Sequence, residues 1–133
     1  MSSSQESQQV AVVTGANSGI GRATAIYLSQ QGYRVFGTVR SLDKAAKLLA
    51  LAEKLSVSIE LVEMDVADDE SVRQGFADIF RAAPRIDVLV NNAGISRISA
   101  ALDTPADLYR KVIDVNLVAP FLLAKAFGKV MIE

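Results

Sequence analysis

The 133-residue sequence contains no cysteine and no histidine. The absence of cysteine excludes disulfide bonds and thiol catalysis, and the absence of histidine excludes any Ser-His-Asp arrangement. A metal site would need carboxylates alone, and none is predicted. Lysine and arginine are spread along the chain without a basic block, which argues against a nucleic-acid-binding protein.

The sequence also lacks the segments that export or membrane insertion requires. Residues 1–8 are polar and have no apolar core, so they are expected to form a disordered tail and not a signal peptide. The longest apolar stretch, 112–130, is no membrane span, because it is interrupted by Asp114, Asn116, Pro120, Lys125 and Lys129. With a net charge of −1 and 50% hydrophobic residues, residues 9–133 are expected to form one globular, cytoplasmic domain.

Short apolar runs alternate with helical patterns throughout this domain. Strands are predicted over 10–13, 34–39, 57–64 and 86–90, and helices over 19–30, 41–55, 70–82 and from about 105 to 132. Ser41 is the expected N-cap of the second helix. Such alternation is typical of the α/β class, here a Rossmann-type doubly wound parallel sheet. The expected strand order is 3-2-1-4, with the sheet ending before a fifth strand.

Residues 14–21 read T-G-A-N-S-G-I-G and join the first strand to the first helix. Gly15 permits a sharp exit from the strand, Gly19 lets backbone N–H groups approach a pyrophosphate, and Gly21 lets the helix pack closely. The first helical turn offers free N–H groups and the positive end of its dipole to an anion. The pattern predicts a dinucleotide site, the alternative being a tight turn without a ligand. The predicted contacts are Thr14, Gly15, Asn17, Ser18, Gly19, Ile20 and Gly21.

A second motif, N-N-A-G at 91–94, follows the fourth apolar run. Together with the T-G-x3-G-x-G spacing, it makes residues 9–133 similar to the short-chain dehydrogenase/reductase family, in the branch with compact subunits. The resemblance implies that the asparagines brace the sheet against the glycine turn through Thr14 and touch the nearer ribose of the cofactor. The contacts implied here are Asn91, Asn92, Ala93 and Gly94.

The end of the second strand indicates which nucleotide is bound. Relatives that prefer NAD carry a carboxylate there for the ribose 2′-OH, whereas this chain has Val39 followed by Arg40. A guanidinium fits a 2′-phosphate with two parallel hydrogen bonds, and Ser41 adds a hydroxyl. We therefore predict NADP(H) in preference to NAD(H), the alternative being an ordinary solvated arginine. By resemblance, Asp65 binds the adenine amino group and Val66 packs near the ring, although Asp65 also suits a turn or helix cap.

The resemblance implies hydride transfer between nicotinamide and a small alcohol or carbonyl substrate, catalysed by an Asn, a Ser, a Tyr and a Lys. Asn116 matches the family asparagine. Pro120 has no N–H, so α-helical spacing would free the Asn116 carbonyl, which in the family holds a water of a proton relay. The alternative is a kinked core helix with Asn116 facing solvent. None of the three tyrosines is followed four residues later by lysine, so the family's Y-x3-K motif is absent.

The missing motif leads us to expect the N-terminal part of a longer reductase, inactive by itself. The unpaired edge of the fourth strand supports this expectation. Two other interpretations stay open: a nucleotide-binding module without chemistry, and a half-enzyme completed by a partner chain. By resemblance, the full-length form is expected to be a homo-oligomer.

Overall fold

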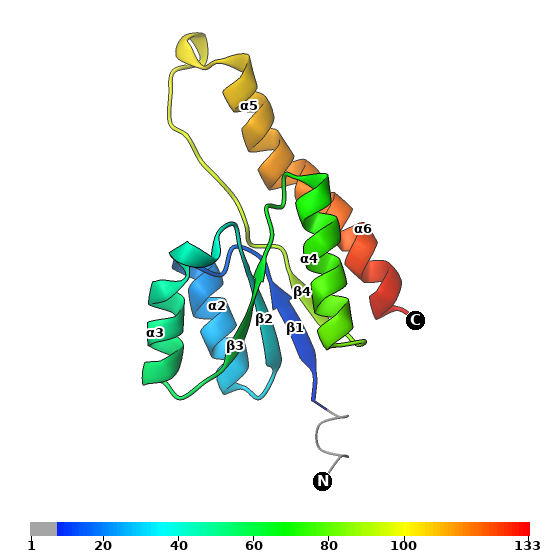
Figure 1. Cartoon of the computed structure of the whole chain (residues 1–133). Helices are drawn as coiled ribbons and strands as arrows, with labels where there is room; N and C mark the ends of the chain where they lie inside the picture. Colours follow the sequence, from blue (N-terminus) through cyan, green and yellow to red (C-terminus); the bar gives the residue numbers. More distant parts are fainter. Residues whose placement is uncertain (1–7) are drawn as a thin grey trace.

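The computed structural model describes residues 8–133 and contains a four-stranded parallel sheet (Figure 1). Its strands are β1 (Val10–Val13), β2 (Arg34–Val39), β3 (Ile59–Glu63) and β4 (Val88–Val90). They lie in the order β3-β2-β1-β4, which confirms the predicted order. Of the expected tail, only Gln8 is among the described residues, and its side-chain amide donates a hydrogen bond to the Gly32 carbonyl oxygen at 3.2 Å.

Helices cover both faces of this sheet. α2 (Gly19–Gln30) and α3 (Ala46–Lys54) lie on one face, and α4 (Asp69–Ala82) and α6 (Ala119–Met131) lie on the other (Figure 1). α5 (Ala106–Ile113) extends beyond the carboxyl ends of the strands and continues into α6 through a π-helical turn at Asp114–Val118. The arrangement leaves the carboxyl ends of the strands facing the space below α5.

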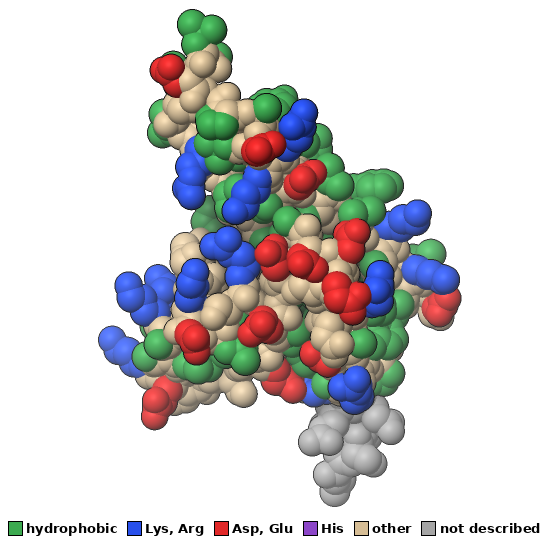
Figure 2. All heavy atoms as spheres, turned by 45° about the horizontal axis from the view of Figure 1, so that its top comes forward, with side chains coloured by type: hydrophobic (Ala, Val, Ile, Leu, Met, Phe, Trp, Pro, Cys, Tyr) green, Lys and Arg blue, Asp and Glu red, His purple; other side chains and the backbone are tan. Residues whose placement is uncertain are grey.

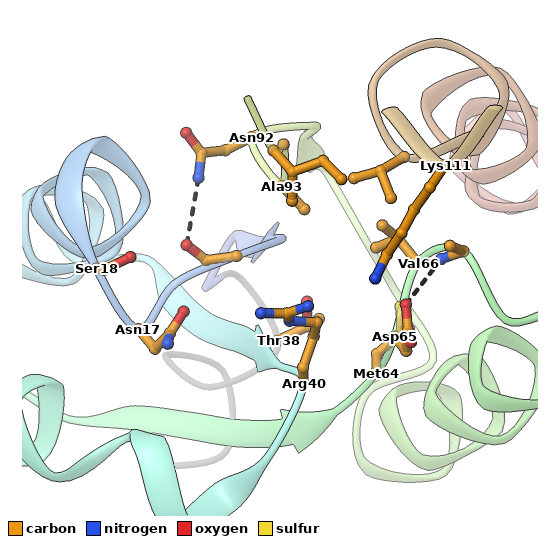
Figure 3. Close-up of a pocket in the computed structure, with 15 residues that line it drawn as sticks. Asn17, Ser18, Thr38, Arg40, Met64, Asp65, Val66, Asn92, Ala93 and Lys111 are labelled. Carbon is orange, nitrogen blue, oxygen red and sulfur yellow. Dashed lines mark hydrogen bonds between the residues drawn. The ribbon is translucent and has the colours of Figure 1, made fainter. Parts of the chain in front are cut away.

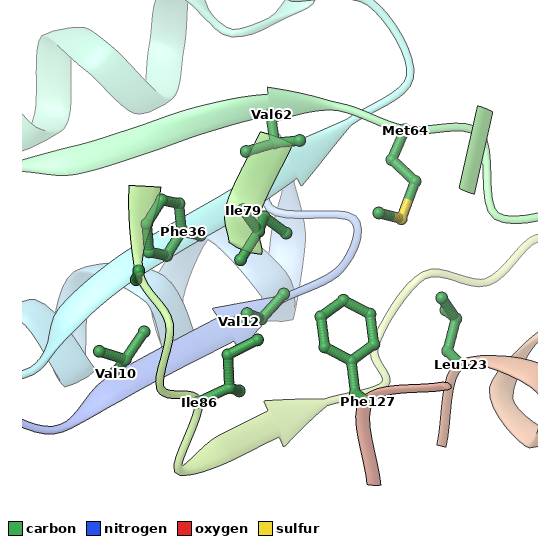
Figure 4. Close-up of a cluster of buried hydrophobic side chains, with 10 residues drawn as sticks. Val10, Val12, Phe36, Val62, Met64, Ile79, Ile86, Leu123 and Phe127 are labelled. Carbon is green, nitrogen blue, oxygen red and sulfur yellow. The ribbon is translucent and has the colours of Figure 1, made fainter. Parts of the chain in front are cut away.

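The alternation of side chains along β1 divides the apolar core in two. Val10 and Val12 belong to the cluster under α4 and α6, together with Phe36, Ile79, Leu123 and Phe127 (Figure 4). Val13 belongs to the cluster under α2 and α3, together with Ala25, Ile26, Val35 and Leu48. Successive strand residues point to opposite faces, so a strand covered on both sides reads as a continuous apolar run.

The helix predicted over 41–55 is divided in the structure. A 3-10 turn at Leu42–Lys44 precedes α3, and the Ser41 side chain makes no capping hydrogen bond. The division occurs at Ala45, whose backbone leaves the α-helical region (φ −90°, ψ 3°) while its methyl group is fully buried. Within α3, Leu48 and Ala52 are buried, whereas Leu49 is 46% exposed and Leu55, directly after the helix, is 41% exposed.

β3 is shorter than the predicted strand over 57–64. Ser56 adopts a positive φ of 56°, and the Val57 N–H donates a hydrogen bond back to the Ala52 carbonyl oxygen at 2.9 Å. The turn that ends α3 therefore uses residues that the alternation pattern assigns to the strand. β3 lies at one edge of the sheet, beside β2.

β4 forms the other edge of the sheet. Within residues 8–133 it is hydrogen-bonded to β1 alone. Its three residues are half-buried, whereas the four residues of β1 are buried. No helix in this part of the chain is long and apolar enough to cross a membrane.

Candidate dinucleotide-binding site

The turn between β1 and α2 has a geometry that requires its glycines. Gly15 and Gly19 have positive φ values of 64° and 54°, which residues with a Cβ rarely adopt. A Cβ on Gly21 would overlap the Gly15 carbonyl oxygen and Nδ2 of Asn92. Ser18 precedes α2 in an extended conformation, and its side chain makes no cap. The start of the helix is thus left free of a side-chain acceptor from Ser18, as suits an anionic ligand.

Thr14 joins this glycine turn to the end of β4. Its hydroxyl accepts hydrogen bonds from the N–H groups of Asn92 and Ala93, both at 3.0 Å, and donates one to the Val90 carbonyl oxygen at 3.4 Å. The Asn92 side-chain amide donates to the carbonyl oxygens of Thr14 and Gly15, at 3.1 and 3.2 Å. Asn92 and Thr14 therefore form a brace between the two motifs.

Asn91 is oriented differently from Asn92. Its side-chain amide donates a hydrogen bond to the Pro120 carbonyl oxygen on α6, at 3.4 Å. Asn91 lines a second hollow beside the brace, together with Asn92, Ala93, Gly94, Ile95, Ser96, Asn116 and Pro120. The two neighbouring asparagines thus serve different contacts: one holds the glycine turn and the other reaches the last helix.

A cavity of about 240 Å³ lies at the carboxyl ends of the strands (Figure 3). The predicted contacts that line it are Gly15, Asn17, Ser18, Arg40, Asp65, Val66, Asn92, Ala93 and Gly94. They come from the segments that follow all four strands. Of the other predicted contacts, Ile20 is 78% exposed at the start of α2, between Gly19 and Gly21, and Ser41 directly follows Arg40.

Two cationic side chains contribute to this cavity. Arg40 follows β2, and Lys111 comes from α5. In Figure 3 the Lys111 side chain extends from its helix toward the space between Arg40 and Asp65. Within residues 8–133, neither cation has a hydrogen bond or an ion pair at its side chain. The cavity therefore carries positive charge that no carboxylate of the described chain pairs directly.

Asp65 stabilises the turn after β3, which is one of the roles that its position in the sequence suggests. Its carboxylate accepts a hydrogen bond from the Ala67 N–H at 3.0 Å, and its own N–H donates to the Ser71 hydroxyl at 2.8 Å. The cap of α4 is instead Asp68, which accepts from the Ser71 N–H at 2.9 Å. Asp65 also lines the cavity, so the turn role is compatible with a ligand contact.

Asn116 clamps the loop that follows β4. Its side-chain oxygen accepts a hydrogen bond from the Ile95 N–H at 2.8 Å, and its amide donates to the Ile95 carbonyl oxygen at 2.7 Å. Gly94 leaves room for this clamp, since a Cβ there would lie 3.2 Å from Oδ1 of Asn116. The pairing fixes Asn116 at the rim of the second hollow, although the residue as a whole is exposed.

The helix around Asn116 is π-helical, which the sequence analysis did not foresee. The Ala119 N–H donates to the Asp114 carbonyl oxygen, five residues earlier, and Pro120 is in the first turn of α6. Pro120 would free the Asn116 carbonyl only in a helix whose hydrogen bonds span four residues. That spacing does not hold at this turn, so the relay role of the carbonyl stays a prediction.

Sequence reasoning missed Thr38, Met64, Ile95 and Lys111, all of which line the cavity. Thr38 could have been found from strand alternation, because it lies two residues before Arg40 and shares its face. Lys111 lies one helical turn before Val115, which also lines the cavity. Predicting Lys111 from this spacing would require knowing that α5 continues into the π-helical turn without a break.

Residues 9–133 match the family profile described as short chain dehydrogenase. The chain belongs to the short-chain dehydrogenase family. The matched range contains the glycine turn, the Thr14 brace and the N-N-A-G segment, which the fold brings together at one edge of the sheet.

Members of the short-chain dehydrogenase family that this chain resembles differ in activity and cofactor. It is 39% identical over 127 residues to 3-oxoacyl-[acyl-carrier-protein] reductase of Synechocystis sp., covering 94% of this chain and 51% of the relative. It is 35% identical over 125 residues to NAD-dependent glycerol dehydrogenase of Listeria innocua, covering 93% and 48%. The crystal structure of a metagenomic short-chain oxidoreductase in complex with NADP has a TM-score of 0.86 at 35% identity, covering 93% of this chain and 57% of that protein. The chain thus spans about half the length of the curated relatives it matches.

Proposed function

We propose that this chain forms the NADP(H)-binding part of an oxidoreductase that transfers a hydride between nicotinamide and an alcohol or carbonyl carbon. The bound dinucleotide would supply the hydride donor or acceptor. The chain's own residues fit such a ligand, because Gly15, Gly19 and Gly21 keep Cβ atoms away from the turn at the start of α2. Asp65 and Val66 would hold the adenine end, and Asn91 and Asn92 the nearer ribose.

The proposed preference for NADP(H) rests on the charge of the cavity. Arg40 stands where an NAD-selective site needs a carboxylate, and Lys111 adds a second cation. A 2′-phosphate would neutralise both and accept paired hydrogen bonds from the guanidinium. A 2′-hydroxyl carries no charge, so the repulsion between the two cations would remain.

Replacement of Arg40 by Ala tests this preference. We expect the ratio of NADPH to NADH affinity to fall about 10- to 100-fold, since charged hydrogen bonds to one phosphate are lost. The change in the fluorescence of the reduced nicotinamide on binding gives the affinity for each of the two dinucleotides. Arg73→Ala, on the exposed surface of α4, is the matched control and should leave the ratio unchanged. An unchanged ratio in Arg40→Ala would refute the NADP(H) preference.

Asn116 is the one residue of the chain that we propose for the catalytic apparatus. Its double hydrogen bond to Ile95 would hold the loop after β4 at the nicotinamide end. The general acid or base, a tyrosine assisted by a lysine, would have to come from residues other than these 133. We therefore expect these residues alone to bind NADPH but to show no turnover with any aldehyde or ketone.

A second candidate is a half-enzyme or binding module, favoured by the absence of Y-x3-K from this sequence. Mixing the chain with a separately produced C-terminal half of a family member separates the possibilities. Restored NADPH oxidation would support completion by other residues, whereas binding without any restored turnover would support a module. Turnover by the 133 residues alone would contradict both.

We also propose that the full-length form is a homo-oligomer. Leu117 and Phe121 are each 66% exposed and lie four residues apart, and Ile132 near the end of α6 is 87% exposed. Apolar groups in this amount at one helix suit an interface. Light scattering of the full-length protein gives the subunit number, and a monomer would contradict the proposal.

A further inference from the structure

Thr38 carries an unusual side chain for its position. It is 1% exposed, and within residues 8–133 its hydroxyl is the one buried side-chain polar atom without a hydrogen-bond partner. Buried polar groups are nearly always paired, because desolvation without a partner destabilises the folded state. The free hydroxyl therefore requires an explanation.

A comparison with Thr14 shows that the local fold is able to satisfy such a group. Thr14 lies on the neighbouring strand with the same 1% exposure, and its hydroxyl takes part in three hydrogen bonds. The main chain of Thr38 is equally well held, since its carbonyl oxygen accepts from the Ala16 N–H at 2.9 Å. Only the side-chain hydroxyl of Thr38 lacks a hydrogen-bond partner within the described residues.

The position of Thr38 indicates where a partner would come from. Its side chain lines the same cavity as Arg40 and Asp65, and all three are seen around one space in Figure 3. The floor of the cavity includes Met64, which is 1% exposed and offers no strong hydrogen-bonding group.

We infer that the Thr38 hydroxyl binds the adenosine part of the dinucleotide, by a hydrogen bond to a ring nitrogen or ribose oxygen. This rests on the proposed function, and it adds a residue that the glycine turn and Arg40 do not account for. The pyrophosphate is expected at the start of α2, whereas Thr38 is the second-last residue of β2 and lies beside the segments after β2 and β3, where the adenosine is expected. A hydroxyl both donates and accepts, so it suits either partner.

The inference predicts opposite effects on stability and on binding. Thr38→Val keeps the shape of the side chain and removes the hydroxyl. Without cofactor, the melting temperature should rise by about 3–6 °C, because an unpaired buried group is gone. The dissociation constants of NADPH and NADH should both increase about fivefold, because the adenosine is common to the two. Thr38→Ser, which keeps a hydroxyl, should bind both nearly as the parent chain does.

The readouts separate this inference from the proposed cofactor preference. Arg40→Ala changes the ratio between the two dinucleotides, whereas Thr38→Val changes both affinities and preserves the ratio. Unchanged affinities in Thr38→Val would overturn the inference and leave the preference for NADP(H) standing. A lower melting temperature or loss of folding in Thr38→Val would also overturn it, since the hydroxyl would then have a structural partner such as a buried water. If the parent chain bound neither dinucleotide, the proposed function would fail first.

Discussion

The two ends of the parallel sheet differ in whether their polar side chains have hydrogen-bond partners within the chain. At the amino ends of the strands, Arg34 forms a two-pronged ion pair with Glu60, at 2.7 and 2.9 Å. Asp87 accepts a hydrogen bond from the Val10 N–H at 2.8 Å and pairs with Arg85 at 2.8 Å. These contacts tie β2 to β3 and β4 to β1, so the charges at this end hold the fold together.

At the carboxyl ends, four polar side chains are left without partners from the described chain. Thr38, Arg40, Lys111 and Ser18 make no side-chain hydrogen bond within residues 8–133, yet all four line one cavity. Other side chains at this end are paired: Thr14 and Asn92 form the brace, Asp65 accepts from the Ala67 N–H, and Asn116 holds Ile95. The two ends thus differ in one respect: the charges at the amino ends are paired within the fold, whereas four polar side chains around the cavity are left free for the dinucleotide that we propose binds there.

The pKa shifts follow the same division. Burial alone would raise the pKa of Asp87, but the Val10 N–H and the Arg85 guanidinium outweigh it and hold that pKa below its ordinary value. The hydrogen bond from Arg34 to Glu60 raises the pKa of Arg34 against the opposing effect of burial. Both shifts favour the charged forms, as expected for groups that are paired in the folded state.

The largest expected effect comes from breaking the support of the carboxyl end. A Cβ at Gly21 would overlap the Gly15 carbonyl oxygen and the Asn92 amide, so Gly21→Ala should lower the free energy of unfolding by about 3 kcal/mol or more and abolish NADPH binding. Urea denaturation measures the first effect. Gly128→Ala, on α6 with open space around it, is the control and should be neutral or stabilise by about 0.5 kcal/mol. Equal stabilities of the two variants would contradict the prediction.

The next effect concerns the brace itself. Thr14→Val leaves the N–H groups of Asn92 and Ala93 without their acceptor, and should lower the free energy of unfolding by about 2 kcal/mol. Weaker NADPH binding should accompany it, because the glycine turn loses its anchor. Thr14→Ser keeps the hydroxyl and should recover most of the stability. If Thr14→Val did not lower the free energy of unfolding, the proposed contrast between Thr14 and Thr38 would be wrong.

A smaller effect should be confined to the amino end. Asp87→Asn weakens the contacts with Val10 and Arg85, and should lower the free energy of unfolding at pH 7 by about 1 kcal/mol without changing NADPH affinity. Because the folded pKa of Asp87 is lowered, its contribution is complete above the unfolded pKa of about 3.9 and is lost as the pH falls through the folded pKa.

Denaturation curves at several pH values therefore test this prediction. The gap between the parent chain and Asp87→Asn should be constant near neutrality and should close in acid. Asp78→Asn, which affects an exposed ion pair with Arg81, is the control and should change stability by less than about 0.5 kcal/mol. A gap that widened in acid would contradict the assignment of the charged form as the stabilising one.

The smallest effect should come from Lys111. Lys111→Ala removes one of the two cations of the cavity, and should weaken NADPH binding about two- to threefold at low salt, with little change in unfolding. The loss should shrink as salt is added, because an exposed cation is screened. Lys129→Ala, at the end of α6, is the matched control. Equal NADPH affinity of the Lys111 variant and the parent at low salt would remove Lys111 from the site.

Much of the architecture could be predicted because it depends on local patterns. A strand that is covered on both faces, such as β1, can be told from a helix by a continuous apolar run of only a few residues. The right-handedness of parallel crossovers then leaves few possible strand orders. The glycine turn was predictable for the same reason, since Gly15 and Gly19 adopt positive φ values within the chain's own local geometry. The errors lie where the backbone departs from a regular pattern, at Ala45, at Ser56 and at the π-helical turn of Asp114–Val118 within the long last helix.

The sequence by itself thus determined the order of strands and helices, the glycine turn between β1 and α2, and the set of segments that meet at the carboxyl ends of the strands. Only the tertiary structure decided that Asn92 serves the brace while Asn91 reaches α6, that Asn116 clamps Ile95, and that Thr38 is left unpaired. Local propensities act over a few residues, whereas a hydrogen bond across 21 to 79 positions exists only once packing has brought its two groups together.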